Sequence, residues 1–322
     1  MKQTLGEVVS ANGMEHRVIL IAGPTASGKS ALALELAREL GRTIINADSM
    51  QIYDGLRLVT ARPDEADEAI APHRLYGTVD PATAFSTGDW LRIVAPLIEE
   101  AKSEGPAPIL VGGTGLYYKA LTEGFAQIPE IDAAIRAECR DLADTGGIEA
   151  VRSALAPLDA AAAAELDDLQ RLTRALEVIK ATGKSLSHWQ SESHAAPLLP
   201  LSNTLPIVLA PPRPWLHDRI AQRSALMTGS AGQNEVASFL ERRLDPTLPA
   251  MRAIGVKEIS SLLKDECDEA EARERLVTAT RQYAKRQETW FRNQMSHWRR
   301  IDPAHFNTRI SLSNVFIDAA TH

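Results

Sequence analysis

The octapeptide Gly23-Pro24-Thr25-Ala26-Ser27-Gly28-Lys29-Ser30 matches the phosphate-binding loop pattern G-x-x-x-x-G-K-[ST] at every fixed position. The short apolar run 18–22 before it is typical of a buried strand. The residues after it, 31–40, are rich in strong helix formers, and Gly41 can end that helix. The strand and helix that should flank such a loop are therefore both expected, and the loop predicts a polyphosphate ligand.

The residue types in this loop suit an anion. Gly23 and Gly28 let backbone amides turn toward a phosphate with no Cβ in the way, and the following helix N-terminus adds partial positive charge. Lys29 supplies a full positive charge, and the Ser30 hydroxyl is placed to ligate Mg²⁺. The alternative is a glycine-rich turn that binds nothing. The loop alone does not say which polyphosphate binds or which bond breaks.

The bulk composition bounds the class of protein. A length of 322 residues favours about two domains, and 44% hydrophobic with 24% charged residues is ordinary for a globular protein. The net charge of -7 gives no global attraction to nucleic acid, so such a partner would need a local basic patch. Cys139 and Cys267 lie far apart in the sequence and form no evident disulfide framework, which fits a reducing cytoplasm. No apolar run reaches membrane-spanning length, and the N-terminal segment lacks the apolar core of a signal peptide.

Two further apolar runs predict buried strands that lead into candidate site residues. The run 43–47 leads into Asp48, and the run 108–111 leads into Gly112-Gly113-Thr114. Ligands gather at the carboxyl ends of parallel strands, so Asp48 could face the phosphate-binding loop as a catalytic carboxylate. The alternative is that Asp48 caps a helix beginning at Met50. Many nucleotide hydrolases carry a Mg²⁺-binding Asp after a later strand, and the glycines found here count against ordinary nucleotide hydrolysis.

Residues from about 125 to 203 form an Ala-rich segment with a helical pattern and no strand signal. Gly146 and Gly147 are expected to end a first helix, and a second helix is expected to begin after Asp168 and to end at Gly183. We therefore expect an all-helical insertion at 125–203 within an α/β core made of residues 1–124 and 204–322.

The C-terminal part carries two basic features. A strand at 205–209 leads into a helix bearing Arg219 and Arg223, which share a face because they are four residues apart. This pair could reach the phosphates, or it could be a solvated basic face. From Arg273 to Arg300 the chain has eight basic and two acidic residues, a net charge of +6, with aromatic residues between them. Such a segment fits an RNA partner, and the alternative is an amphipathic helix whose aromatic residues pack in the core.

Taken together, these segments resemble the tRNA dimethylallyltransferases, also called isopentenyltransferases. The matching motifs, in the order of the family, are 23–30, 48–49 with 51–53, 60–63, 72–75, 111–117, 170–178, 252–257 and 280–287. One such motif would be weak, whereas the full set in this order is highly specific.

The resemblance implies transfer of a dimethylallyl group from dimethylallyl diphosphate to the exocyclic amine of an adenosine. That adenosine lies 3′ of the anticodon in tRNAs that read codons beginning with U. The implied fold is α/β and P-loop NTPase-like, a parallel sheet flanked by helices, with the helical insertion clamping the anticodon stem. Diphosphate is the leaving group. In this family the residue at Thr25 donates to the bridging oxygen, that at Asp48 is the general base, and that at Arg223 binds the diphosphate; Arg219 is a second candidate for that contact.

The resemblance also assigns the binding residues and partners. The residues expected to bind diphosphate are Gly23, Pro24, Thr25, Ala26, Ser27, Gly28, Lys29, Ser30 and Arg223, with Ser30 on Mg²⁺. Those expected to contact tRNA are Asp48, Ser49, Met50, Gln51, Thr114, Arg136, Gln170, Arg171, Leu172, Thr173, Arg174, Arg252, Ala253, Ile254, Gly255, Val256 and Lys257, to which the basic helix adds Arg281, Lys285 and Arg286. The target base is stacked in the anticodon loop, so we expect the enzyme to flip it out. We expect a cytoplasmic monomer without a membrane or protein partner.

The chain departs from the family pattern in a few places. Asp167 stands where Asn is expected, Leu169 stands where Pro is common, and 230–236 lacks an aromatic residue expected after its glycine. Three other functions stay open at this point. They are an ATP-dependent small-molecule kinase, a prenyltransferase acting on free adenine nucleotides, and a catalytically silent RNA-binding module.

Overall fold

The computed structural model describes residues 16–126, 128–192 and 196–305. The N-terminal segment, for which no signal peptide is predicted, lies outside the described residues up to position 15. Contacts divide the chain into two compact units, residues 1–122 with 199–322 and residues 123–198. None of the helices within the described ranges has both the length and the apolar character needed to span a membrane.

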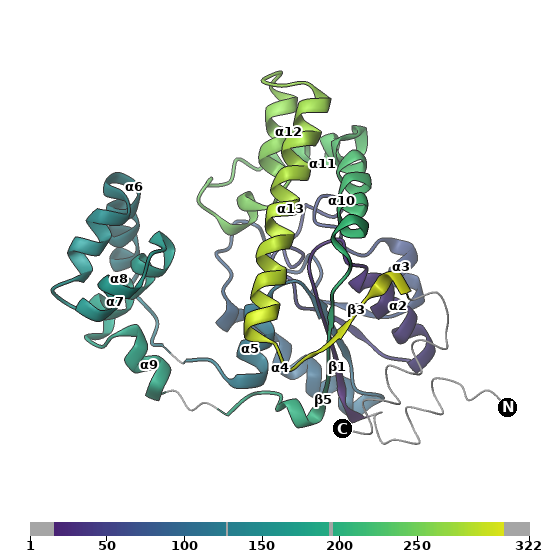
Figure 1. Cartoon of the computed structure of the whole chain (residues 1–322), viewed down its shortest axis with the longest axis horizontal. Helices are drawn as coiled ribbons and strands as arrows, with labels where there is room; N and C mark the ends of the chain where they lie inside the picture. Colours follow the sequence, from purple (N-terminus) through teal and green to yellow (C-terminus); the bar gives the residue numbers. More distant parts are fainter. Residues whose placement is uncertain (1–15, 127, 193–195, 306–322) are drawn as a thin grey trace. The chain divides into compact units, whose positions relative to one another are not determined.

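The larger unit is built on one six-stranded sheet (Figure 1). In sheet order the strands are β3 (His73–Arg74), β2 (Ile44–Asn46), β4 (Ile109–Gly112), β1 (Val18–Ala22), β5 (Thr204–Leu209) and β6 (Arg299–Ile301). Every neighbouring pair is parallel, and Ile21 of β1 stands opposite Val111 of β4 and Ile207 of β5. The predicted α/β fold with a parallel sheet is confirmed. The short strands β3 and β6 were not expected from the sequence.

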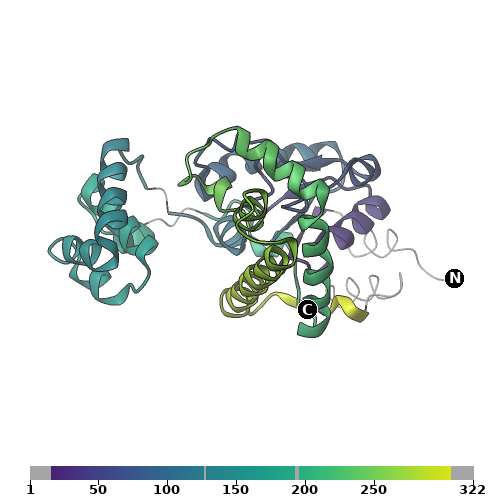
Figure 2. The same ribbon diagram turned by 90° about the horizontal axis from the view of Figure 1, so that it is seen from above.

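Alternate side chains of β1 pack on opposite faces of the sheet, as a strand requires. Ile19 and Ile21 pack with the apolar side of α2 (Lys29–Leu40). Val18 and Leu20 belong to the core that includes α4 (Thr87–Glu104), α5 (Gly115–Glu123), α12 (Val256–Leu263) and α13 (Glu269–Gln294). The sheet is thus covered by helices on both faces. Figure 2 gives a second view of these helices. The remaining elements of this unit are α3 (Glu65–Ile70), α10 (Arg213–Thr228), α11 (Ser230–Glu241) and the 3-10 turns η2 (Leu201–Asn203), η3 (Pro249–Arg252) and η4 (Pro303–His305).

The glycines after β4 have a packing reason. A Cβ on Gly112 would lie 2.0 Å from the Ala47 carbonyl oxygen, so only glycine lets the ends of β2 and β4 come this close. A Cβ on Gly115 would lie 2.1 Å from the ring of Trp290 on α13. These glycines bring the carboxyl ends of two strands and the last long helix together.

The second unit consists of α6 (Ala133–Leu155), α7 (Ala160–Glu165), α8 (Leu169–Thr182) and α9 (Leu186–Glu192), with no strand among its described residues. Gly147 (φ 63, ψ -160) breaks the regular helix inside α6, where a stop was expected. The Asp168 side chain caps α8 by accepting from Arg171 N, and left-handed Gly183 ends it. The unit ends at Leu198, before the expected boundary at residue 203, because Leu199 is buried in the main core and bonds to Leu121.

Candidate functional site

The phosphate-binding loop follows β1 at the carboxyl end of the sheet and leads into α2. Gly28 adopts a left-handed conformation (φ 88) at the start of α2, where an L side chain would be strained. The Lys29 ammonium donates to the Pro24 carbonyl oxygen at 2.7 Å. The Ser27 hydroxyl is buried and finds no hydrogen-bond partner among the described residues, whereas Ser30 is exposed. The loop therefore has a charged and a polar group to offer a ligand.

Asp48 lies beside this loop, in a turn that follows β2. One carboxylate oxygen accepts from Met50 N at 2.9 Å, and the other accepts from Gly113 N at 3.3 Å. No helix begins at Met50 in the described chain, so the alternative of a helix cap is wrong. The Asn46 amide holds the turn by donating to Asp48 O and accepting from Asp48 N. Thr114 adds a second link by accepting from Ser49 N at 2.9 Å.

Arg223 on α10 reaches the same place from the other side of the loop. Its Nη1 donates to Thr25 Oγ1 at 2.9 Å and its Nη2 donates to Val59 O at 2.9 Å, while its buried Nε has no partner among the described atoms. Arg219 stays exposed, donates to Ala26 O at 3.0 Å and lies over the Trp215 ring. Both arginines therefore contact the phosphate-binding loop, so a purely solvated basic face does not describe them.

The charges of this site influence one another. Burial lowers the pKa of Lys29 to about 8, an effect that the Asp48 carboxylate opposes and the Arg223 guanidinium reinforces. Burial also lowers the pKa of Arg223, again opposed by Asp48. Two cations and one carboxylate are thus gathered at the loop. The net positive charge suits an anionic ligand such as a polyphosphate.

Gln287 on α13 is a site residue that the sequence interpretation did not assign. Its side-chain oxygen accepts from Thr25 N at 2.8 Å, and its side-chain nitrogen donates to Gly113 O at 2.9 Å. A Cβ on Gly113 would lie 2.3 Å from the Gln287 nitrogen and 3.1 Å from an Asp48 oxygen. One buried amide therefore ties the phosphate-binding loop to the end of β4. The available signal was its position, because Gln287 falls between Ala284 and Phe291 on the buried side of α13.

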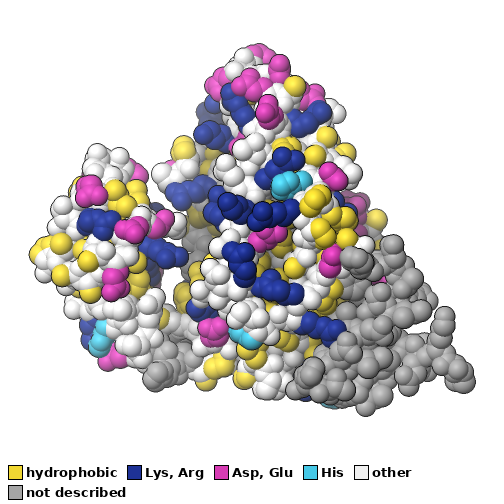
Figure 3. Space-filling view, in the orientation of Figure 1, with side chains coloured by type: hydrophobic (Ala, Val, Ile, Leu, Met, Phe, Trp, Pro, Cys, Tyr) yellow, Lys and Arg dark blue, Asp and Glu magenta, His cyan; other side chains and the backbone are white. Residues whose placement is uncertain are grey.

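The basic helix α13 buries one of its aromatic residues, half-buries Tyr283 and Trp290, and keeps much of its charge outside. Phe291 is buried in the core, whereas Arg281, Lys285 and Arg286 are exposed. Figure 3 shows Lys and Arg side chains gathered on this face of the molecule. Not every cation of α13 is available to bind a phosphate, because Arg273 pairs with Glu269 and Arg275 pairs with Glu271 on the same helix. A cavity of about 250 Å³ between α10 and α13 is lined by Arg213, Leu216, His217, Arg281, Gln282, Ala284, Lys285 and Glu288.

Two further stretches expected at an RNA surface contain both exposed and buried members. In 252–257, Arg252 and Lys257 are exposed, but Ala253 and Val256 are core residues. In the helical unit, Gln170 and Arg171 are exposed, but Leu172 is fully buried. Arg136 and Arg174 are partly exposed, and Arg174 pairs with Glu177 at 3.2 Å. Buried side chains cannot touch RNA, so any contact from these stretches falls to their exposed members and to the backbone.

Comparison with protein families and named proteins gives matches along most of the chain. A family model described as IPP transferase matches residues 51–294, and one described as Isopentenyl transferase matches residues 16–80. A tRNA dimethylallyltransferase from Allorhizobium ampelinum is 50% identical over 289 residues, which cover 89% of this chain and 95% of the relative. A tRNA dimethylallyltransferase from Rhodopseudomonas palustris is 49% identical over 305 residues, which cover 94% of this chain and 96% of the relative.

Solved structures give the same picture. The full-length tRNA isopentenylpyrophosphate transferase from Bacillus halodurans superimposes with a TM-score of 0.66 at 32% identity, covering 95% of this chain and 98% of that one. A eukaryotic dimethylallyltransferase, studied acting on tRNA, superimposes with a TM-score of 0.77 at 26% identity, covering 94% of this chain and 79% of that one.

Proposed function

The chain belongs to the IPP transferase family of tRNA dimethylallyltransferases, and we propose from this how its own residues prenylate tRNA. It is a transferase of the tRNA-modifying class. We take dimethylallyl diphosphate as the donor and the exocyclic amine of the adenosine 3′ of the anticodon as the acceptor. The observation that supports this most is the Asp48 carboxylate beside the cationic phosphate-binding loop, because transfer to an amine needs a base next to the bound diphosphate.

The reaction breaks the allylic C–O bond of the donor and forms a C–N bond to the adenine amine. The electron pair of the C–O bond leaves with the diphosphate, where Lys29, Arg223 and the loop amides offset its charge. We propose that the Thr25 hydroxyl donates to the bridging oxygen, and its hydrogen bond from Arg223, which leaves its own proton free to donate, supports this role. As the adenine nitrogen becomes positively charged, its proton passes to the Asp48 carboxylate.

We propose Mg²⁺ as the cofactor. Ser30 is exposed at the start of α2, where a hydroxyl can be a ligand. Within residues 16–126, 128–192 and 196–305, no group of three or more His, Cys, Asp or Glu side chains could hold a metal ion. The donor's diphosphate oxygens and water would therefore supply most of the ligands, as Mg²⁺ prefers. When bound, the ion adds positive charge beside the leaving diphosphate.

The tRNA surface that we propose includes Asp48, Ser49, Met50, Gln51 and Thr114 beside the site. Further members are the exposed residues of 252–257 and the cations Arg281, Lys285 and Arg286 on α13. The exposed residues of α8 and Arg136 would hold the anticodon stem. The target base would be flipped from its stack to reach Asp48. We further propose a monomer that works in the cytoplasm.

The function is tested by a transfer assay with Mg²⁺ and labelled dimethylallyl diphosphate, offered separately with bulk tRNA, AMP and ATP. Label is expected in tRNA alone. Label in AMP would instead support a prenyltransferase acting on free adenine nucleotides. Consumption of ATP without transfer would support a kinase, and tRNA binding without transfer would support a silent RNA-binding module.

Binding of the donor should weaken at alkaline pH. Because the pKa of Lys29 is about 8, its ammonium is charged below that pH and becomes neutral above it in the free protein. A bound diphosphate favours the charged form, so its dissociation constant should rise about tenfold per pH unit above pH 8. Titration calorimetry with dimethylallyl diphosphate between pH 7 and pH 10 measures this. Lys29→Met should bind weakly at pH 7 and lack the steep rise, and an equally steep rise in that variant would assign the titration to another group.

The salt dependence of tRNA binding should report the α13 cations. Replacing Arg281 and Arg286 with glutamine removes two exposed charges and should flatten the slope of log K against log salt by about 1.5. Arg275→Gln is the matched control, because this arginine pairs with Glu271 on the same helix and should change the slope little. Filter binding over a range of salt concentrations makes the comparison. An unchanged slope in the double variant would remove this helix from the RNA surface.

A further inference from the structure

Three successive backbone amides of the loop at residues 57–59 point at one carboxylate from a distant helix. Glu235 on α11 accepts from Arg57 N and Leu58 N with one oxygen, both at 2.7 Å. Its other oxygen accepts from Val59 N at 2.8 Å. Successive N–H groups form an anion-binding concavity, and here the protein's own carboxylate fills it. Hydrogen bonds to a charged acceptor are stronger than neutral ones, so this contact defines the backbone of the 57–59 loop.

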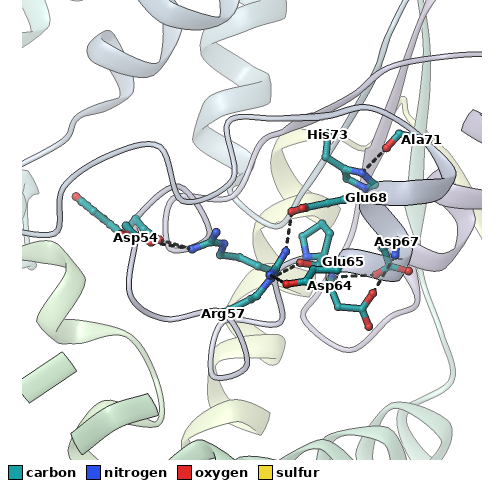
Figure 4. A network of polar contacts seen from close by, with 11 residues as sticks. Asp54, Arg57, Asp64, Glu65, Asp67, Glu68, Ala71 and His73 are labelled. Atoms are coloured by element: carbon teal, nitrogen blue, oxygen red, sulfur yellow. Dashed lines mark hydrogen bonds and ion pairs between the residues drawn. The ribbon is translucent and has the colours of Figure 1, made fainter. Parts of the chain in front are cut away.

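Further contacts hold the Arg57 side chain and the residues that follow the 57–59 loop. The Arg57 side chain donates to Pro63 O at 2.7 Å and pairs with Glu68 of α3 at 2.8 Å. Figure 4 shows Arg57 and the Glu68 carboxylate with which it pairs. Gln51 donates to the carbonyl oxygens of Thr60 and Ala61 at 2.9 and 2.8 Å. The loop therefore has little freedom once Glu235 is in place.

The same loop presents one carbonyl to the catalytic arginine. Val59 N donates to Glu235, and Val59 O accepts from Arg223 Nη2 at 2.9 Å. The other terminal nitrogen of Arg223 donates to the Thr25 hydroxyl. A continuous set of hydrogen bonds thus runs from Glu235 through Val59 and Arg223 to the phosphate-binding loop. A shift of Val59 would turn the guanidinium away from Thr25.

The position of Glu235 depends on close packing between α10 and α11. A Cβ on Gly232 would lie 1.9 Å from the Met227 carbonyl oxygen, so α11 can begin this close to the end of α10 only with glycine there. Arg223 and Glu235 therefore stand on two helices held in a fixed relation. The stretch 230–236 departs from the family pattern, but two of its residues have clear roles. Gly232 allows the close packing of α10 and α11, and Glu235 binds the 57–59 loop.

We propose that Glu235 is a positioning residue for the transfer reaction. It acts by holding the 57–59 loop, whose Val59 carbonyl orients Arg223 toward Thr25 and the bound diphosphate. This inference rests on the proposed function, in which Arg223 binds the leaving diphosphate. Glu235 itself need touch neither substrate.

The first test replaces Glu235 with glutamine, which keeps the shape but removes the charge. We expect kcat to fall about 10- to 100-fold, because a small misplacement of an orienting group has effects of this size, while the dissociation constant for tRNA stays within about twofold. Glu241→Gln is the matched control on the same helix, since the Glu241 side chain is exposed and makes no hydrogen bond or ion pair with the described part of the chain. A kcat equal to that of the control would overturn the proposal.

The second test asks whether Glu235 acts through Arg223. In an Arg223→Lys background, Glu235→Gln should lower kcat by no more than about threefold, because the group that it orients is already changed. A purely structural role would instead give the same fold-loss in both backgrounds, and that result would overturn the proposal. If Glu235→Gln fails to fold, as judged by thermal unfolding, Glu235→Asp takes its place in the cycle with the same expectation.

A binding measurement separates this inference from the proposed function. In the proposed site, binding of inorganic diphosphate depends on Arg223 and requires neither tRNA nor the transfer reaction. Its affinity can therefore be measured by calorimetry whatever the acceptor is. Glu235→Gln should weaken this binding about tenfold, with Glu241→Gln unchanged. Weakened binding together with no transfer by the wild type would keep the positioning role and reject the function. Unchanged binding together with normal transfer would reject the positioning role alone.

Discussion

Replacing Asp48 with alanine is expected to slow prenyl transfer by about 10²- to 10⁴-fold, the range typical of a lost general base, while tRNA affinity stays within a few-fold. In the proposed mechanism the adenine nitrogen passes its proton to the Asp48 carboxylate, so the alanine variant has lost its base. Single-turnover transfer and tRNA filter binding measure the two quantities. The assay should be run near pH 7. Loss of the Asp48 carboxylate lowers the pKa of Lys29, and the lower pH keeps more of the Lys29 ammonium charged.

Asp48→Asn is the control for shape. Asparagine can still accept from Met50 N, so the turn after β2 should persist while the base is lost. Both variants should therefore be slow, and Asp48→Asn should keep the thermal stability of the wild type to within a few degrees. Turnover near the wild-type rate in either variant would show that the general-base assignment is wrong.

Thr25→Val should have the second large effect. Valine keeps the volume of threonine but removes the hydroxyl that accepts from Arg223 and that we propose donates to the bridging oxygen. Losing one such donor to a developing oxyanion costs about 10²- to 10³-fold in kcat. Rapid-quench measurement of diphosphate release at saturating tRNA reports this step.

The comparison variant at this position is Thr25→Ser, which restores the hydroxyl and should recover most of the rate. Arg223 then regains its acceptor, and the Thr25 backbone link to Gln287 is unchanged in either variant. Equal rates for the serine and valine variants would place the hydroxyl outside the reaction and leave Arg223 and Lys29 to hold the diphosphate.

Local signals in the sequence predicted local structure well. Gly41 ends α2, and Asp168 and Gly183 bound α8, because caps depend on residues only a few positions apart. The phosphate-binding loop was predicted for the same reason. The strands β3 and β6 were missed because they are two and three residues long, include charged residues and gain their structure from their neighbours in the sheet.

Long-range contacts set the limit of prediction at the site. Thr25 and Gln287 meet across 262 positions, and Val59 and Glu235 meet across 176. Nothing in a single sequence states that α13 returns to the phosphate-binding loop or that α11 approaches the 57–59 loop. The strand order is also hard to predict. In the sheet β4 lies between β1 and β2, although β1 and β2 both precede β4 in the chain. Asp48 and Arg223 were candidates from their positions after predicted strands, and the family resemblance implied their roles and that of Thr25. Gln287 and Glu235 required the fold.

We propose that this chain transfers a prenyl group to one adenosine beside the anticodon. The most direct measurement uses two anticodon stem-loop RNAs that differ only at that position, one with adenosine and one with guanosine, incubated with Mg²⁺ and dimethylallyl diphosphate. Mass spectrometry of the RNA should show one added prenyl group on the adenosine RNA and none on the guanosine RNA. Equal modification of both RNAs, or of neither while free AMP is modified, would contradict the proposed acceptor.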